Sequence, residues 1–401
     1  MSITEQPKQS EADDDLPPRW GALLGVTAAL AAFGAGQGLS YPLFSILMQR
    51  QDMSPVLIGL SAAMMPVGLI TSAVFIPQLV SRFGARNLAV ACAIGAAICF
   101  LLIGALQNWV AWFAVRFLLG VIINPLYVLG EIWALALAPP KRRGRVMGVF
   151  NAIMGGGYAA GPLALALLGA GGWPPFLFAI AAFLGCGLVL FLVTADLPGF
   201  DNEAGPDDTN AVAGVTSFAP LAPALLFAVL VSAAVQQSTY ALTPVFGAAY
   251  GLGEATQASL VTALSLGNIF LQVPLGLAAE RFGARMMMVG CALTTAVCAV
   301  LVGVLISGPF IWLVLMVMGG VGYGVYTMAL VELGNRFKGA TLVAGNSAFA
   351  LMWGMGGIAG PPVAGTLMHV VGPLGLPGSI ATLSMLTSAF VLYRSIARRH
   401  S

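Results

Sequence analysis

The chain has 401 residues, of which 59% are hydrophobic and only 8% charged. Soluble domains carry roughly 45–50% apolar and roughly 25% charged residues, so these values exclude a soluble protein of this size. A net charge of +2 excludes a nucleic-acid-binding surface, and the many apolar residues exclude a disordered chain. Two His and five Cys without a C-x-x-C pair leave little material for a metal site or a disulfide framework, so neither is expected. We therefore expect membrane lipid to be the solvent for most of the chain.

Residues 1–19 are polar and acidic and include Asp13, Asp14 and Asp15. A secretory signal would instead start with basic residues and continue into an apolar stretch. We expect this segment to be a disordered cytoplasmic tail.

From Trp20 onward, apolar segments of about 20 residues or more recur, each long enough to cross a hydrocarbon core of roughly 30 Å as a helix. Lipid offers the backbone no hydrogen-bond partners, so these segments are expected to be α-helices. The sequence predicts twelve spans, at residues 21–47, 55–80, 86–106, 109–137, 146–170, 174–194, 219–247, 255–279, 286–307, 310–333, 341–370 and 374–394.

A long polar interruption divides the spans into two sets of six. The predicted organisation is a six-helix bundle over 20–195, a cytoplasmic linker over 196–218, a second six-helix bundle over 219–395 and a cytoplasmic tail over 396–401. All of the 17 Lys and Arg residues except Arg50 and Arg116 fall in the tails or in connections on one side. Cytoplasmic loops hold the excess of Lys and Arg, so both termini are expected in the cytoplasm. The expected location is the cell membrane, as a multi-pass protein of a bacterial inner membrane.

An internal repeat relates the two halves. Residues 82–86 read RFGAR and recur at 281–285, an offset of 199 residues. The same offset carries Gln37 onto Gln236, Tyr41 onto Tyr240, Cys92 onto Cys291, Cys99 onto Cys298, Gly120 onto Gly319, Tyr127 onto Tyr326, Phe150 onto Phe349 and Gly161 onto Gly360. The sequence thus predicts a tandem duplication of a six-helix unit, with a pseudo-two-fold axis along the membrane normal and a path between the halves.

These features resemble the major facilitator superfamily, and the likeness covers residues 20–395. The resemblance implies an all-α integral membrane fold, with twelve transmembrane helices in two six-helix bundles related by pseudo-two-fold symmetry. It also implies a secondary transporter that works by alternating access. More narrowly, the stretch from Tyr127 to Arg145 is similar to uncharacterised bacterial permeases typified by YcaD.

The family's loop between the second and third helices reads approximately G-x-x-x-D-R-x-G-R and latches the cytoplasmic side of the outward-open state. The repeated pentapeptide resembles this loop, but the first copy has Ser81 in place of the acidic residue. The resemblance therefore implies a more complete latch in the second half than in the first. The residues that it assigns to coupling or gating are Arg82, Arg86, Glu280, Arg281 and Arg285.

The fourth and fifth helices resemble two further family patterns. Arg116 and Gly120 match R-x-x-x-G, and the fifth helix matches the antiporter-associated G-x-x-x-G-P but departs from it afterwards. Small residues and prolines in the fifth helix and its repeat are expected to permit helix bending and rocking between the bundles, with plain helix packing as the alternative. These residues are Gly157, Gly161, Pro162, Gly356, Gly360 and Pro361.

Placing an ionisable group at the bilayer centre costs about 2.5–3.5 kcal/mol. The presence of Arg116 and Glu131 inside the fourth helix therefore indicates a specific role for each. Together with Gly120, Asn124 and Tyr127 they fall within an arc of about 80° on that helix. We expect this polar stripe to face the central path. Because ~22 Å separates Arg116 from Glu131 along the axis, each of them needs another partner.

Two interpretations remain open for each of these charges. Glu131 is either one side of a gate salt bridge, with Arg82 or the basic cluster from Lys141 to Arg145, or a protonatable carboxylate that couples transport to protons. Arg116 either attracts an anion or tunes a neighbour's proton affinity, or it is a structural arginine.

Neutral polar residues in the spans are candidates for the substrate path. Gln37 and Tyr41 lie one turn apart on the first helix and are repeated in the second half, and such side chains suit a substrate with polar groups and apolar bulk. Hydrogen bonding between helices is the alternative. The candidate path residues are Gln37, Tyr41, Asn124, Tyr127, Gln236, Tyr240, Asn268, Gln272 and Tyr326.

No nucleotide-binding motif is present, so a proton gradient is the expected energy source and no cofactor is expected. The antiporter pattern favours proton-coupled efflux of a small amphipathic metabolite or drug by a monomer. Proton-coupled uptake by symport and facilitated diffusion are the alternatives. A membrane-embedded enzyme is a remote alternative, because the two His provide no convincing catalytic set, and no catalytic residue is assigned.

Overall fold

The computed structural model describes residues 20–138, 143–193, 197 and 218–397. The predicted N-terminal tail and nearly all of the predicted linker lie outside these residues. The described residues form thirteen helices and no strand: α1 (Trp20–Gln49), α2 (Pro55–Ala73), α3 (Ile76–Phe83), α4 (Ala85–Ala105), α5 (Trp109–Leu137), α6 (Arg143–Leu168), α7 (Pro174–Leu192), α9 (Pro223–Ala249), α10 (Glu254–Phe282), α11 (Ala284–Leu305), α12 (Ile311–Arg336), α13 (Gly339–Val371) and α14 (Gly375–Ala397).

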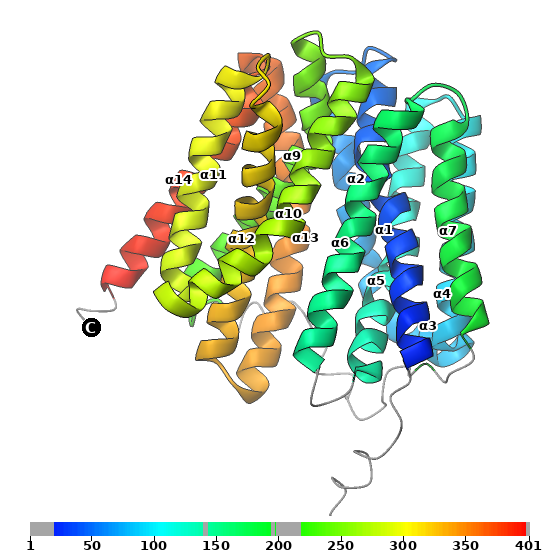
Figure 1. The fold of residues 1–401 in the computed structure, drawn as a ribbon, viewed down its shortest axis with the longest axis horizontal. Helices are drawn as coiled ribbons and strands as arrows, with labels where there is room; N and C mark the ends of the chain where they lie inside the picture. Colours follow the sequence, from blue (N-terminus) through cyan, green and yellow to red (C-terminus); the bar gives the residue numbers. More distant parts are fainter. Residues whose placement is uncertain (1–19, 139–142, 194–196, 198–217, 398–401) are drawn as a thin grey trace, which may run out of the picture.

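Every helix except α3 is long and apolar enough to cross a membrane, which confirms the twelve predicted spans. Figure 1 shows the helices in two bundles that stand side by side, α1 to α7 and α9 to α14. Large apolar side chains are exposed on the outer helices, such as Phe191 of α7 at 68% and Val304 of α11 at 73%. Exposure of this kind is unfavourable in water and favourable in lipid.

The two bundles use the same packing scheme. In the first bundle α1 packs on α6, α2 on α5 and α4 on α7. In the second bundle the corresponding pairs are α9 with α13, α10 with α12 and α11 with α14. Between the bundles, α2 packs on α13 and α6 packs on α10. Each half therefore gives its second and fifth spans to the interface, as the predicted pseudo-two-fold relationship requires.

Glycines set the close approach of the first and fifth spans within each bundle. Gly157 of α6 lies against the backbone of Ala31 in α1, with no room for a side chain. Its repeat, Gly356 of α13, lies in the same way against Leu230 of α9. Small residues at these positions let the two backbones come into contact, which is how helices gain dispersion energy in lipid.

The second span differs from its predicted form, because the helix breaks between Ala73 and Ile76. Pro77 has no N–H and cannot donate to the carbonyl of Ala73, so the helix ends there and restarts as the short α3. The equivalent position in the second half is Gly276, and α10 runs through it without a break. The two halves are thus similar but not identical.

The repeated RFGAR segment forms the same tight connection in both halves. Gly84 and Gly283 both adopt a left-handed backbone conformation, with φ of 79° and 85°. Residues other than glycine rarely adopt this conformation, so it accounts for the glycine in both copies.

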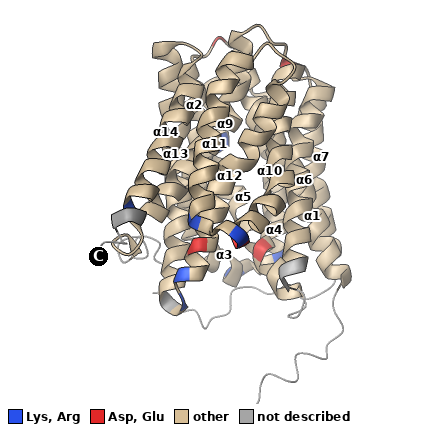
Figure 2. Ribbon diagram, turned by 60° about the vertical axis from the view of Figure 1, so that its left-hand side comes forward, with Lys and Arg blue, Asp and Glu red and all other residues tan. Residues whose placement is uncertain are grey.

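Charged residues gather at one end of the molecule, where α3 ends and α13 begins (Figure 2). We call it the basic end, defined among the described residues by Arg82, Arg86, Arg281, Arg285, Arg336, Lys338 and Arg394. The other end, where α1 ends and α10 begins, is called the opposite end.

Candidate functional site

The two bundles meet closely at the opposite end. Arg50, which follows α1, forms a two-pronged ion pair with Glu254 at the start of α10, with both N–O distances at 2.6 Å. A third nitrogen of Arg50 donates to the carbonyl of Ala170 at 3.0 Å. The hydrogen bond to Glu254 raises the pKa of Arg50 above its ordinary value. This ion pair joins the first bundle to the second.

Below this ion pair, α1 and α9 are in direct contact. Ser45 donates a hydrogen bond to the carbonyl of Ala241 across the interface. The rings of Tyr41 and Tyr240 lie 5.9 Å apart between their centroids, so two residues that the repeat made equivalent face each other. The Tyr41 hydroxyl also interacts with the side chains of Gln37 and Gln237.

The basic end is open by comparison. Glu131 of α5 is exposed there, although it lies ~9 Å inside the end of its helix. Among the described residues, α5 and α12 make no substantial contact with each other. The described chain is therefore closed at the opposite end and open at the basic end.

Tyrosines from both bundles lie near Glu131. Tyr127 of the first bundle and Tyr323 and Tyr326 of the second lie within electrostatic range of its carboxylate. Tyr326 packs against Trp353 of α13 with ring centroids 4.6 Å apart, and Tyr323 lies 5.5 Å from Tyr326. We call Tyr127, Glu131, Tyr323, Tyr326 and Trp353 the aromatic site.

Glu131 makes no ion pair with any cation whose side chain the structure describes. The side chains of the basic cluster from Lys141 to Arg145, which the sequence offered as a partner, lie outside the described part of the chain. The choice between a gate salt bridge and a coupling carboxylate therefore stays open.

Arg116 is completely buried in the half of α5 nearer the opposite end, between α1 and α2. One of its nitrogens donates to the Ser61 hydroxyl at 3.2 Å, and the guanidinium lies 4.4 Å from the centre of the Phe44 ring. The other two nitrogens have no hydrogen-bond partner among the described residues. A buried guanidinium with open donors is a suitable binding group for an anion.

Other predicted path residues are held within their own bundle. Asn124 donates to the carbonyl of Leu69 and to the hydroxyl of Ser72, both in α2. Gln37 is fully buried and donates to the sulfur of Met65, while its carbonyl oxygen has no partner among the described residues. These contacts correspond to the interhelical alternative that the sequence left open.

In the second bundle, Gln272 joins α10 to α12. Its amide donates to Asn268 and to the carbonyl of Gly320, and its oxygen accepts from Thr327 at 2.8 Å. Gln236 is half-buried on α9, but its neighbour Gln237 is the one that interacts with Tyr41. Whether these residues line a substrate path stays a prediction.

The predicted latch residues lie together at the basic end. Arg82 and Arg281 each lie over the ring of the next phenylalanine, at 5.4 and 5.5 Å. Arg285 pairs with Glu332 of α12 at 3.0 Å. Within the described residues, no ion pair of Glu280 is present.

The predicted bending residues lie within the bundles. Gly161 and Gly360 contact α1 and α9 of their own halves, as Gly157 and Gly356 do. Gly155 and Gly354, their neighbours along the helices, instead face side chains of the other bundle, Ile269 and Ile70. Pro162 and Pro361 lie inside helices that continue without a break.

Several residues of the site were missed from the sequence. Tyr323 is the one that the repeat could have revealed, because the offset of 199 residues places it at the position equivalent to Asn124. Trp353 corresponds to Met154 and gives no such signal. The pairing of Arg50 with Glu254 had no signal either, since the two residues are 204 positions apart.

No group of three or more His, Cys, Asp or Glu side chains in the described part of the chain is placed to hold a metal ion. The five cysteines are buried and unpaired with one another. Two pseudo-symmetric bundles with a polar and aromatic interface, closed at one end, are the architecture of a membrane transporter.

Comparison with known proteins agrees with this class. A family model described as Major Facilitator Superfamily matches residues 26–259 and again 225–401, so the chain belongs to this superfamily of secondary transporters. An uncharacterised MFS-type transporter of Bacillus subtilis (strain 168), YfkF, is 25% identical over 346 residues, covering 84% of this chain and 86% of the relative.

Solved structures share the fold at low sequence identity. The nucleoside transporter NupG matches with a TM-score of 0.70 at 15% identity, over 94% of this chain and 98% of that chain. A D-xylose-proton symporter matches with a TM-score of 0.71 at 15% identity, over 94% and 97%. A bacterial homologue of the lysosomal transporter Spinster, in an inward-facing and unoccupied conformation, matches with a TM-score of 0.67 at 15% identity, over 95% of both chains.

Proposed function

We propose that this transporter exports a small amphipathic organic cation in exchange for protons, with the basic end in the cytoplasm. The excess of Lys and Arg at that end supports the orientation. On this assignment the described conformation is open to the cytoplasm and closed to the outside.

The observation that carries the proposal is the exposed carboxylate of Glu131 within the aromatic site. Ionised, this carboxylate attracts a cation, and the faces of Tyr323, Tyr326 and Trp353 add cation–π attraction of about 0.5–2 kcal/mol per contact. Protonated, the same group has no charge to offer. A proton and an organic cation therefore compete for one site. If this site opens to each side of the membrane in turn, such competition is sufficient for exchange.

The proposal is tested by equilibrium binding to the purified protein in detergent, with tetraphenylphosphonium as the cation and tetraphenylborate as an anion of nearly the same shape. We expect the wild type to bind the cation in preference to the anion, and to bind it less tightly as the pH falls. Glu131→Gln should weaken cation binding at least about tenfold and remove its pH dependence. Tyr326→Phe, which keeps the ring, is the matched control and should bind as the wild type does.

Transport is tested separately in proteoliposomes with ethidium as the cation. With a pH gradient across the membrane, protons leave the acidic compartment through the wild-type exchanger. Ethidium moves in the opposite direction and should therefore accumulate in the acidic compartment. Glu131→Gln should lose this gradient-driven accumulation. Binding and accumulation that are unchanged in Glu131→Gln would overturn the proposal.

A second candidate is proton-coupled uptake of an organic anion, and a specific observation favours it. Arg116 is a buried guanidinium with two nitrogens that lack partners among the described residues, on the closed side of the aromatic site. Preferential binding of tetraphenylborate that Arg116→Gln abolishes would favour this candidate over cation export.

A further inference from the structure

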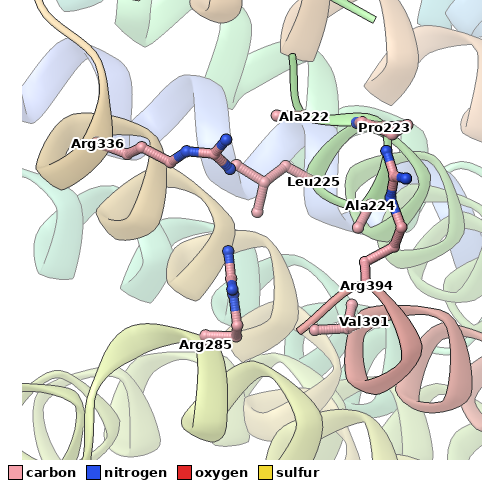
Figure 3. A pocket seen from close by; sticks show the side chains of 8 residues that line it. All are labelled: Ala222, Pro223, Ala224, Leu225, Arg285, Arg336, Val391 and Arg394. Carbon is pink, nitrogen blue, oxygen red and sulfur yellow. The ribbon is translucent and has the colours of Figure 1, made fainter. Parts of the chain in front are cut away.

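The environment of Arg116 differs from that of the arginines at the ends of the spans. Figure 3 shows Arg285, Arg336 and Arg394 around the start of α9, at the basic end of the second bundle. Arg285 pairs there with Glu332 at 3.0 Å, and Arg336 is exposed. Arg116 is instead fully buried inside a span, and it makes no ion pair with a described carboxylate. A buried charge of this kind is unfavourable unless a counter-charge accompanies it.

The first bundle supplies no such counter-charge near Arg116. Along the described helices α1 to α7, Glu131 is the only acidic residue, and it lies ~22 Å away along α5. The Phe44 ring lies 4.4 Å from the guanidinium carbon, and Ser61 accepts a hydrogen bond from Nη1 at 3.2 Å. Neither of these groups carries a negative charge.

The two nitrogens of Arg116 without a partner among the described residues are Nε and Nη2. They are neighbours on one edge of the planar guanidinium, so their N–H groups point in the same direction. Such a pair of donors forms the fork with which arginine binds anions side-on. The free edge of Arg116 therefore has the geometry of an anion-binding group.

Further donors lie beside this fork. The guanidinium is within electrostatic range of the Tyr41 hydroxyl. Tyr41 and the amide of Gln37 both donate to the sulfur of Met65, at 3.8 and 2.9 Å, and a thioether sulfur is a weak acceptor. We call Gln37, Tyr41 and Arg116 the Arg116 site. Even with the free oxygen of Gln37 counted, its donors outnumber the good acceptors, and its charge is positive.

Close packing around the Arg116 site limits the size of an anion that it can enclose. Phe44 and Ser61 are 0% exposed, and Met65 is 1% exposed. Gly120, one turn along α5 from Arg116, lies against the backbone of Met65 with no room for a side chain. Because α2 and α5 are in backbone contact beside the guanidinium, a bulky organic anion would have to part the two helices. A monatomic anion needs the least space.

We propose that the Arg116 site binds a small monovalent anion of the halide class, such as chloride, as a resident counter-ion and not as cargo. The fork of Arg116 donates to the anion, with the Tyr41 hydroxyl and the Gln37 amide as additional donors. The anion neutralises the buried charge and joins α1 to α5, and it therefore stabilises the first bundle. The proposal does not rest on cation export at the aromatic site. It also differs from uptake of an organic anion, in which Arg116 holds the cargo.

The test measures the melting temperature of the purified full chain in detergent, with sodium chloride replacing sodium gluconate at constant ionic strength. We expect the wild-type melting temperature to rise with chloride and to saturate, as binding to one site requires. Arg116→Met keeps the apolar stem and should show no saturable rise. In Tyr41→Phe, chloride should bind about tenfold more weakly, because a hydrogen bond to a charged ligand is lost. Lys338→Gln, the matched control, removes an exposed positive charge at the basic end and should respond as the wild type does.

Crystals of the wild type grown in sodium bromide provide a measurement that needs no variant. We expect an anomalous bromide peak within hydrogen-bonding distance of Nε and Nη2 of Arg116. An ordered Arg116 without such a peak would overturn the proposal, and so would an equal chloride response of the wild type and Arg116→Met. Stabilisation by tetraphenylborate but not by chloride would also overturn it, in favour of organic-anion uptake. A failure of cation binding at Glu131 would leave all of these outcomes unchanged.

Discussion

Arg50 and Glu254 form the most direct ionic link between the two bundles among the described residues, through two N–O contacts of 2.6 Å. The link lies at the opposite end, just beyond the contact between Tyr41 and Tyr240. Opening of that end must separate the two residues, because they belong to different bundles. The ion pair therefore stabilises the conformation that is open at the basic end.

The first prediction concerns this ion pair. Glu254→Gln should shift the population toward the conformation open at the opposite end, by a factor of about 1.4 to 5, because partly exposed ion pairs contribute about 0.2–1 kcal/mol. Pulse dipolar spectroscopy between spin labels on the two bundles at that end would measure the shift. Since the hydrogen bond to Glu254 raises the already high pKa of Arg50, Arg50 keeps its charge across the pH range of such an experiment.

The matched control is Asp52→Asn, which removes a negative charge at the same end that makes no ion pair with a described residue. It should leave the distance distribution as in the wild type. An unchanged distribution in Glu254→Gln would contradict the assignment of the pair as a stabilising link.

The second prediction concerns the close contact of α1 with α6. Gly157→Ala should lower the free energy of unfolding by about 1–3 kcal/mol, since a methyl group at this position meets the backbone of Ala31. Gly156→Ala, one residue earlier, meets no atom within 4 Å and should be neutral or slightly stabilising. Thermal unfolding in detergent measures both. Equal effects of the two substitutions would refute the packing argument.

The third prediction concerns the buried charge of Arg116. Arg116→Met keeps the apolar stem and removes a guanidinium that has one hydrogen bond and one aromatic contact. Because an unpaired buried charge is unfavourable, this variant should be more stable than the wild type, by about 1 kcal/mol or more. A more stable variant that no longer transports would indicate a role in function, whereas a clear loss of stability would identify Arg116 as a structural residue.

The fourth prediction concerns the connection between α10 and α11. Gly283→Ala should cost about 1 kcal/mol of stability, because φ at this position is 85°. Gly276→Ala, where α10 is regular and no atom crowds the position, should increase stability slightly. Chemical denaturation of the purified protein would compare them. Similar values for both glycines would show that the left-handed connection is not preserved.

The sequence predicted the twelve spans and the two-bundle arrangement because both depend on simple patterns. Apolar length identifies a span, and the offset of 199 residues identifies the duplication. Neither pattern reports a local backbone defect, so the break at Pro77 was missed in a segment that is apolar on both sides of it.

The candidate site was predicted less completely, because the face of a helix that meets a neighbour cannot be read from its own residues. The polar stripe of α5 is a single stripe in the sequence, yet Asn124 is bound to α2, Tyr127 packs on Phe33 of α1 and Glu131 is exposed at the basic end. In lipid, apolar residues cover both the buried and the outward faces, so hydrophobic periodicity does not distinguish them. Contacts such as Arg50 with Glu254 depend on the relative placement of the bundles, which no local pattern encodes.

The break at Pro77, set against the unbroken helix at Gly276, has a consequence for motion. A helix bends most easily where its backbone hydrogen bonds are interrupted, which in the first half is the break around Phe75, whereas α10 continues as one helix through Pro274 and Gly276. We therefore expect the two halves to contribute unequal movements to the transport cycle, with more bending between α2 and α3 than within α10.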